Sequence, residues 1–338
     1  MTLRDLQPRE LRASELYGND WFNGQPVLMS SMRGRVVLVV FWDYTSIRCD
    51  HVLPYIAEWH RRYSPLGLVV VGVHTPRFDF GKVPEYVDDA ICARNIQFPV
   101  VMDNEALIWT KYGNREWPGI QVVDGDGFIR YQHMGEGHYA VIEQLIQSML
   151  HDTGVREDFP LLMDPIREED KAGAVLHRST EELFAGYIRS SVGNTEGVVP
   201  EAITTYEDPG IYFDGRIYFK GSWRNGRNSA QSQGDQADVI AHYKGTDVYA
   251  VLSGIDASDC LIKLQLDGEA LSEENKGDDV SRDTKERSTI HANRPRRYSL
   301  VRSKEYGEHT LRMSFGANSP LLYTLSFVAG VIPELVSS

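Results

Sequence analysis

Long apolar runs and helical patterns alternate along roughly the first 150 residues of the chain. Residues 35–41 (RVVLVVF) and 68–73 (LVVVGV) are almost wholly apolar, which is typical of strands buried on both faces of a sheet. Between them, residues 49–63 carry apolar side chains at helical spacing, and Pro54 is expected to kink the predicted helix. A strand, a helix and a second strand in this order predict an α/β domain with a central sheet.

The same rhythm continues to residue 153, where we place the end of the first domain. Two further helices are predicted near residues 84–94 and 105–112. A hairpin follows, with strands at 120–123 and 128–133 on either side of the sequence DGDG. A helix at residues 139–150 then closes the domain.

The pattern changes after residue 153. Residues 154–196 lose strand character and contain prolines and an acidic run, which predicts a linker with a short helix near residues 181–187. From 197 to 338, short alternating or apolar runs recur without helices between them, which predicts an all-β, jelly-roll-like sandwich. The linker holds more apolar side chains than a flexible tether carries, so we expect it to pack against the domains.

Composition narrows the class of protein. The 338 residues are 42% hydrophobic and 25% charged, as in a globular protein, and the net charge of −13 argues against a nucleic-acid groove. No apolar run reaches the roughly 18 residues of a membrane helix. The N-terminus has no apolar signal region, so we expect a cytoplasmic location, or an extracytoplasmic one if a signal has been removed. Three cysteines, far apart, do not suggest a disulfide framework or a zinc site.

The most informative segment is FWDYTSIRCD at residues 41–50, where the first buried strand gives way to the helix. A cysteine in this place lies at a helix N-terminus, where the helix dipole and free amides stabilise a thiolate. This is the position of the thiol site in a thioredoxin fold. Pro118, after Trp117, stands before a predicted hairpin strand, as does the cis-proline beside such sites, and we expect the bond between them to be cis.

Four separated blocks of sequence resemble one family. They are FWDYT with CDHVLPY, then GVHTPRF, then YGN with WP, and finally IRYQHMGEG. In this order they resemble the thioredoxin-like domain of DipZ-type proteins, which is part of the redoxin (AhpC/TSA, TlpA-like) superfamily. Blocks EELFAGY, DVYAVL and LDG resemble the second domain of DipZ ectodomains, a sandwich like that of carbohydrate-binding modules.

The resemblance implies a thiol-disulfide oxidoreductase with a Cys-x-x-Cys motif, but this chain reads Ser46-Ile47-Arg48-Cys49. A serine hydroxyl cannot ionise near neutral pH as a thiol can, so ordinary dithiol exchange should fail in the serine form. Three accounts are open. Ser46 replaces a native cysteine or selenocysteine, Cys49 acts alone, or the protein binds a partner without reacting.

In the native mechanism that the resemblance implies, residue 46 attacks a disulfide and Cys49 resolves the mixed intermediate. Pro118 positions the substrate backbone. The residues expected to contact the substrate are Trp42, Tyr44, Thr45 and Trp117. The expected partners are a protein or small-molecule disulfide and a thiol electron donor, and no cofactor or metal is expected.

Two competing functions remain. A redox-inactive binding module would use the same groove without exchange, and a thiol- or selenol-dependent peroxidase would reduce peroxide at residue 46. A dedicated peroxiredoxin site is not present, because Asp43 and Val39 stand where that family has threonine and proline.

Several other residues have a plain structural interpretation beside a functional one. We expect Cys92 and Cys260 to be packing residues, His133 and His138 to form a turn instead of a metal site, and Glu136 to bond locally. In the second domain the aromatic residues that could stack on a carbohydrate are expected to lie mostly in the core; they are Tyr212, Tyr218, Trp223 and Tyr243. The basic residues that could bind phosphate are expected to pair with acidic loops; they are Arg294, Arg296, Arg297, Arg302 and Lys304.

Overall fold

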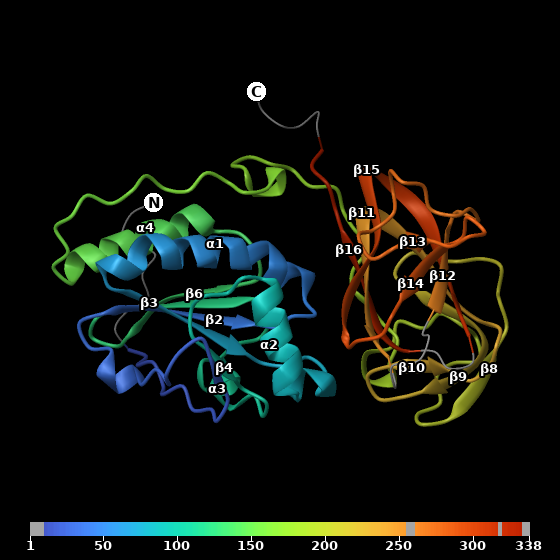
Figure 1. Cartoon of the computed structure of the whole chain (residues 1–338), viewed down its shortest axis with the longest axis horizontal. Coiled ribbons are helices and arrows are strands. Elements are labelled where there is room, and N and C mark those ends of the chain that lie inside the picture. Colours follow the sequence, from blue (N-terminus) through green and yellow to red (C-terminus); the bar gives the residue numbers. More distant parts are fainter. Residues whose placement is uncertain (1–9, 255–260, 317–319, 333–338) are drawn as a thin grey trace. The chain divides into compact units, whose positions relative to one another are not determined.

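The computed structural model describes residues 10–254, 261–316 and 320–332 (Figure 1). The chain divides into two compact units, residues 1–170 and 171–338. Among the residues described, no helix is long and apolar enough to cross a membrane.

The first unit is built on a six-stranded sheet in the order β1-β4-β3-β2-β5-β6. Its strands are β1 (Trp21–Phe22), β2 (Val36–Trp42), β3 (Leu68–His74), β4 (Val100–Met102), β5 (Gly119–Val123) and β6 (Ile129–Met134). Strands β2, β3 and β4 are parallel, whereas β5 runs antiparallel to β2 and to β6. This is the thioredoxin-like α/β arrangement that the sequence predicted.

Helices cover both faces of this sheet. They are α1 (Ile47–Tyr63), α2 (Pro84–Ala93), α3 (Leu107–Lys111) and α4 (Tyr139–Asp152). Alternate residues of β2 point to opposite faces: Leu38 and Val40 pack in one apolar layer with α1 and α4, while Val39 packs in another with α3. In Figure 1, α1 and α4 lie side by side over the sheet, and the rings of Tyr55 and Tyr139 stack with centroids 3.7 Å apart.

The predicted elements of this unit are confirmed, with ends that shift by at most two residues. The short strands β1 and β4 were not predicted, because two or three residues are too few to show a periodic pattern.

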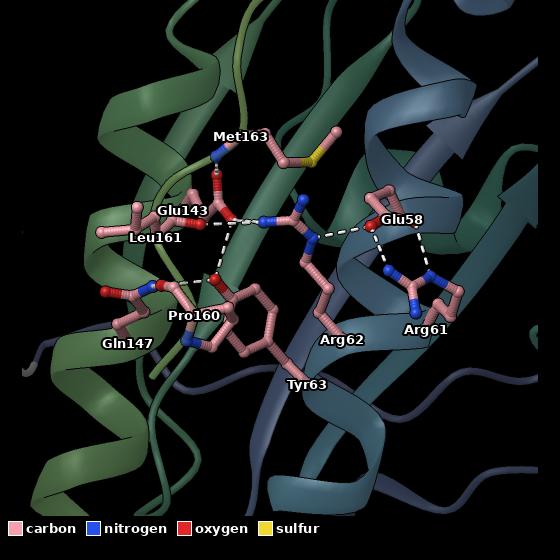
Figure 2. A network of polar contacts seen from close by, with 9 residues as sticks. All are labelled: Glu58, Arg61, Arg62, Tyr63, Glu143, Gln147, Pro160, Leu161 and Met163. Carbon is pink, nitrogen blue, oxygen red and sulfur yellow. Dashed lines mark hydrogen bonds and ion pairs between the residues drawn. The ribbon is translucent and has the colours of Figure 1, made fainter. Parts of the chain in front are cut away.

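The first part of the predicted linker packs on the first unit through polar contacts (Figure 2). The buried Glu143 carboxylate of α4 accepts hydrogen bonds from the Tyr63 hydroxyl (2.7 Å) and the Met163 amide (2.8 Å). Arg62 donates to the Leu161 carbonyl (2.9 Å), and Gln147 donates to the Pro160 carbonyl (2.9 Å). Residues 160–163 are therefore fixed against α1 and α4 and do not form a free tether.

The short helix predicted near residues 181–187 is wrong. Residues Leu183–Phe184 form strand β7, which pairs with strand β16 (Leu321–Val328), and a single 3₁₀ turn follows at Tyr187–Arg189. The Leu183 and Ala185 side chains lie in the core of the second unit, and the Ala185 amide donates to the Tyr323 carbonyl (2.9 Å). Tertiary pairing of this segment therefore overrides its helical spacing.

The second unit is all-β, as predicted, with its strands around a single apolar core. Besides β7 and β16 its strands are β8 (Ile203–Tyr206), β9 (Ile217–Asn225), β10 (Ala230–Ser232), β11 (Ala237–Ser253), β12 (Leu261–Leu266), β13 (Ser281–Arg282), β14 (Ser288–His291) and β15 (Arg296–Phe315). Strand β11 pairs with β9 through residues 238–241 and with β16 through residues 247–253, with a register shift between Gly245 and Asp247. This irregularity lets one long strand take part in both layers of a sandwich.

Candidate functional site

The candidate site lies where β2 ends and α1 begins, beside the carboxyl end of the parallel strand β3. Ligands of open α/β sheets bind at this edge. Ser46 is the N-cap of α1 with extended backbone angles (φ −83°, ψ 120°), and its amide donates to the Asp43 carbonyl (3.1 Å). Its hydroxyl makes no capping bond to the helix backbone but lies near enough to the Cys49 thiol to lower the pKa of that thiol. Positions 46 and 49 thus face each other across the first turn of α1.

Cys49 is fully buried, and this burial raises the pKa of its thiol to about 12. The Asp43 backbone and the Ser46 hydroxyl lower that pKa, while the carboxylates of Asp43 and Asp50 raise it. Since the thiolate is the nucleophile, Cys49 is not reactive by itself at neutral pH. It can attack only a group that is brought to it, such as a bond formed at position 46.

A buried carboxylate shapes the loop before Ser46. Asp43 is 1% exposed and accepts hydrogen bonds from the Thr45 amide (2.8 Å), the Thr45 hydroxyl and the Arg77 amide (3.0 Å). Arg94, after α2, donates to the Tyr44 carbonyl (2.9 Å) and pairs with Asp50 (2.7 Å) on the first turn of α1. Thr45, which we expected to contact the substrate, is itself buried and supports the loop.

His74, the last residue of β3, lies on the same face of the sheet as Trp42, its register partner on β2. Its ring stacks on Tyr44 (centroids 5.4 Å, 15° between planes) and meets Trp42 edge-on (5.2 Å, 76°). Trp42 and Tyr44, expected to wall the site, are thus buried around this histidine. His74 had no predicted role beyond its place in the GVHTPRF block, although its position at the end of a buried strand was a usable signal.

The bond between Trp117 and Pro118 is cis, as predicted. Gly119 pairs with Phe41 in the register of β5 and β2, so Pro118 stands at the level where β2 runs into the 43–46 loop. The indole of Trp117 donates to the Thr75 carbonyl (2.9 Å), and the Gly135 amide donates to the Pro118 carbonyl (2.8 Å). The proline is therefore fixed between the end of β3 and the turn after β6.

That turn carries an ion-paired contact to α1 that the sequence did not reveal. Glu136 contacts the His51 ring (2.5 Å) and Arg167 (3.2 Å), so the expectation that it bonds only locally is wrong. Burial raises the pKa of Glu136, but His51, Arg167 and Arg48 outweigh it and hold that pKa below its usual value. These partners come from segments far apart in sequence, which no local pattern could connect.

The two neighbouring histidines form a turn, as interpreted. His133 bonds the Glu136 carbonyl (2.9 Å), its ring stacks on His138 (4.4 Å), and His138 contacts the Tyr131 hydroxyl (2.8 Å). Within the described ranges, no group of three or more His, Cys, Asp or Glu side chains could hold a metal ion.

The other two cysteines, Cys92 and Cys260, were both expected to be packing residues. Cys92 is exposed on α2, so its prediction as a packing residue is wrong; the apolar spacing of that helix points its neighbours Val87 and Ile91 inward instead. Cys260 lies outside the described residues.

In the second unit, the structural interpretations hold. Tyr218, Trp223 and Tyr243 are buried in it, and Tyr212 bonds Asp208 (2.7 Å), so the four do not form an open stacking platform. Arg296 pairs with Asp279 (2.7 Å) and Arg302 with Asp278 (3.1 Å), which confirms the pairing of basic residues with an acidic loop.

Comparison with protein families assigns both units. Residues 12–132 match the AhpC/TSA family, and residues 180–327 match the family described as the thioredoxin-like C-terminal domain. The chain joins an AhpC/TSA domain to a thioredoxin-like C-terminal domain. The AhpC/TSA domain carries the site at positions 46 and 49, and the predicted resemblance to DipZ-type proteins is confirmed by the relatives below.

Among relatives, protein DipZ of Mycobacterium tuberculosis is 31% identical over 237 residues, which are 69% of this chain and 34% of DipZ. The chain therefore spans about a third of the length of the DipZ proteins it matches. The chloroplastic protein Suppressor of quenching 1 of Arabidopsis thaliana is 33% identical over 132 residues, 39% of this chain and 12% of that protein. The thiol-disulfide oxidoreductase ResA of Bacillus anthracis is 24% identical over 113 residues, 33% of this chain and 62% of ResA.

A solved structure of a putative thiol:disulfide interchange protein DsbE from Chlorobium tepidum is also similar to part of this chain. It is 22% identical, covers 42% of this chain and 98% of its own, and has a TM-score of 0.38.

Proposed function

We propose that the protein is a thiol-disulfide oxidoreductase whose working pair occupies positions 46 and 49. The observation that carries this proposal is the contact of the residue 46 side chain with the Cys49 thiol at the N-terminus of α1. A group at position 46 can accept a substrate sulfur and pass the bond to Cys49 in the next step. The relationship to DipZ and ResA supports the same chemistry.

We also propose that the catalytically active form has cysteine or selenocysteine at position 46. Three further features support this proposal: the N-cap position of residue 46, the buried thiol of Cys49 and the cis-proline that precedes β5. A hydroxyl at position 46 cannot form the mixed disulfide that Cys49 would resolve. Reading codon 46 of the gene, including whether it is TGA, tests this point directly.

A non-catalytic binding module is the second candidate, and the fully buried thiol of Cys49 favours it for the serine form. In that function the backbone beside Pro118 would pair with an extended peptide without exchange. A peroxidase function of residue 46, a carbohydrate ligand of the second unit and the cytoplasmic location stay predictions.

The experiment that separates the two functions compares the chain with its Ser46→Cys variant in the reduction of insulin disulfides by dithiothreitol. We expect the variant to accelerate insulin reduction well above the dithiothreitol background and the serine form to leave it unchanged. A Ser46→Ala variant controls for the loss of the hydroxyl. Equal activity of all three proteins would refute the oxidoreductase proposal and leave the binding module.

A further inference from the structure

His74 is a buried histidine without any hydrogen bond. It is 0% exposed, and neither Nδ1 nor Nε2 has a partner among the described residues. Buried polar atoms are nearly always hydrogen-bonded, because an unpaired one loses its bonds to water without gaining a partner in the protein. An unpaired ring that stacks on Tyr44, in the loop before Ser46, therefore calls for a reason other than stability.

The surroundings of His74 connect it to the loop that carries Ser46 and to the apolar layer that contains Cys49. Trp42 and Tyr44, which contact its ring, share one apolar layer with Cys49. The Asp43 carboxylate lies 3.7 Å from Nε2, too far for a hydrogen bond, and the same carboxylate acts electrostatically on the Cys49 thiol. Asp43 therefore acts electrostatically on both the imidazole and the thiol.

Other charged groups near His74 already have partners. Asp50 and Arg94 pair with each other, and the Asp103 carboxylate accepts from the Thr75 hydroxyl and from two amides at the start of α3. Asp79 and Lys82, in the 3₁₀ turn that packs over the ring, pair with each other near the surface. Asp43 accepts three hydrogen bonds, and His74 is the group in this set whose ring nitrogens have no hydrogen-bond partner.

We propose that His74 accepts the proton of the Cys49 thiol when that thiol closes the bond to residue 46, and that Asp43 stabilises the resulting imidazolium. This inference rests on the proposed function. Burial lowers the pKa of His74 to about 4, so the ring is neutral and able to accept a proton over the physiological range. Asp43 opposes that lowering, which is the sign expected of a group that stabilises the charged ring.

The bonds and electrons balance in two steps. First, the thiolate or selenolate of residue 46 attacks the substrate disulfide, forms a mixed disulfide and releases one substrate thiolate. Second, the Cys49 sulfur attacks residue 46, the bond to the second substrate sulfur breaks, and that sulfur leaves as a thiolate. The Cys49 proton passes to His74 in the same step and later returns to solvent or to a thiolate. The substrate disulfide gains two electrons, and the pair at 46 and 49 is oxidised to one bond.

The second step is the one that needs a base. With its pKa near 12, the Cys49 thiol holds its proton at neutral pH, and only a thiolate attacks efficiently. Because the sulfur loses proton affinity as it bonds to residue 46, transfer to a weak neighbouring base becomes feasible during that step and not before it. Positioned general bases contribute typically about 10²–10⁴-fold to a rate.

A two-phase reaction separates the steps. The full chain carrying Ser46→Cys, Cys92→Ser and Cys260→Ser is mixed with dithiobis-nitrobenzoate, and release of the coloured thiol is followed by stopped flow. The first equivalent reports attack by position 46, and the second equivalent reports resolution by Cys49. We expect His74→Phe to slow the second phase by about 10²-fold or more at pH 7 and the first phase by less than about threefold.

The pH profile distinguishes a base from a packing residue. With His74 present, the second phase should be nearly independent of pH from about 5 to 8, because the ring is neutral throughout. In the His74→Phe variant it should rise about tenfold per pH unit, following the small thiolate fraction of Cys49. His74→Gln, which keeps a polar amide but offers no comparable base, should behave like His74→Phe and gives the answer if the phenylalanine variant fails to fold.

His60→Phe is the matched control, because His60 is a half-buried histidine at the far end of α1 that contacts Phe98. A second phase unchanged in both His74 variants, with a normal first phase, would overturn the role of His74 and leave the proposed function intact. The same slowing in His60→Phe would also overturn it. Absence of the first phase would instead refute the oxidoreductase function itself.

Discussion

Replacing His74 by phenylalanine should make the first unit more resistant to acid without weakening it at neutral pH. The ring makes no hydrogen bond to lose, and a phenyl ring can keep the stacking on Tyr44. His74 has a pKa of about 4 in the folded protein and 6.5 as its ordinary value. Below pH 6.5 the unfolded chain therefore binds a proton that the folded chain does not.

The size of this effect follows from proton linkage. Folded stability is unaffected by His74 above pH 6.5 and falls as pH drops from 6.5 toward 4, where the folded ring also becomes protonated. The difference between the two pKa values corresponds to on the order of 3 kcal/mol in the free energy of unfolding. About 2 kcal/mol of this destabilisation should appear between pH 7 and pH 4.5. Carboxylates titrate in the same range, but they are common to both proteins.

The assay is urea unfolding of the parent chain and of His74→Phe at pH 7 and pH 4.5, followed by tryptophan fluorescence. Five of the six tryptophans, Trp21, Trp42, Trp59, Trp109 and Trp117, lie in the first unit, so the signal reports mainly its unfolding. Between pH 7 and pH 4.5, the free energy of unfolding of the parent should fall by about 2 kcal/mol more than that of the variant. Equal losses, or a variant markedly less stable at pH 7, would refute the picture of a neutral, unpartnered ring.

Three further predictions concern the two units. Glu143→Gln should lower the free energy of unfolding of the first unit by about 1.5–3 kcal/mol, because the buried carboxylate that accepts hydrogen bonds from Tyr63 and Met163 loses its charge. The control in the same denaturant titration is Glu157→Gln, since Glu157 is exposed. An equal change in both variants would contradict the contacts drawn in Figure 2. In the folded serine form, thiol reagents should modify exposed Cys92 quickly and Cys49 only after denaturation. Mass mapping of the labelled peptides measures this difference. Rapid labelling of Cys49 in the folded protein would contradict its burial. Gly186→Ala should destabilise the second unit by more than about 1 kcal/mol, because a β-carbon at residue 186 would lie 2.2 Å from the Asn228 backbone. Gly234→Ala is the control, since a β-carbon there would meet no atom within 4 Å. Similar melting temperatures of the two variants would argue against the close approach at Gly186.

The sequence was sufficient for the elements that build the site. The apolar runs of β2 and β3, the helix between them and the proline before β5 are all local signals, and each was found in place. The long-range partners were not predictable in this way. Glu136 meets His51 and Arg167 only because β6, α1 and the 160–170 segment are brought together by the fold.

Two errors have a common physical cause. Residues 181–187 have helical spacing, yet Leu183 and Phe184 pair with β16 because a partner strand and an apolar core are available. Cys92 was expected to pack because it lies on a predicted helix, but its place on α2 turns it to solvent. Residue type and spacing set a preference, and the packing of the whole unit decides the outcome.

The central claim, a redox pair at positions 46 and 49, is tested most directly by equilibrating the Ser46→Cys variant in dithiothreitol buffers of graded potential and counting alkylated thiols by mass spectrometry. The account predicts that two thiols, at position 46 and at Cys49, disappear together in one two-electron transition. Its midpoint should lie within the range of about −120 to −270 mV that spans thioredoxin-fold oxidants and reductants. Independent oxidation of the two thiols, or no bond between them at any potential, would contradict it.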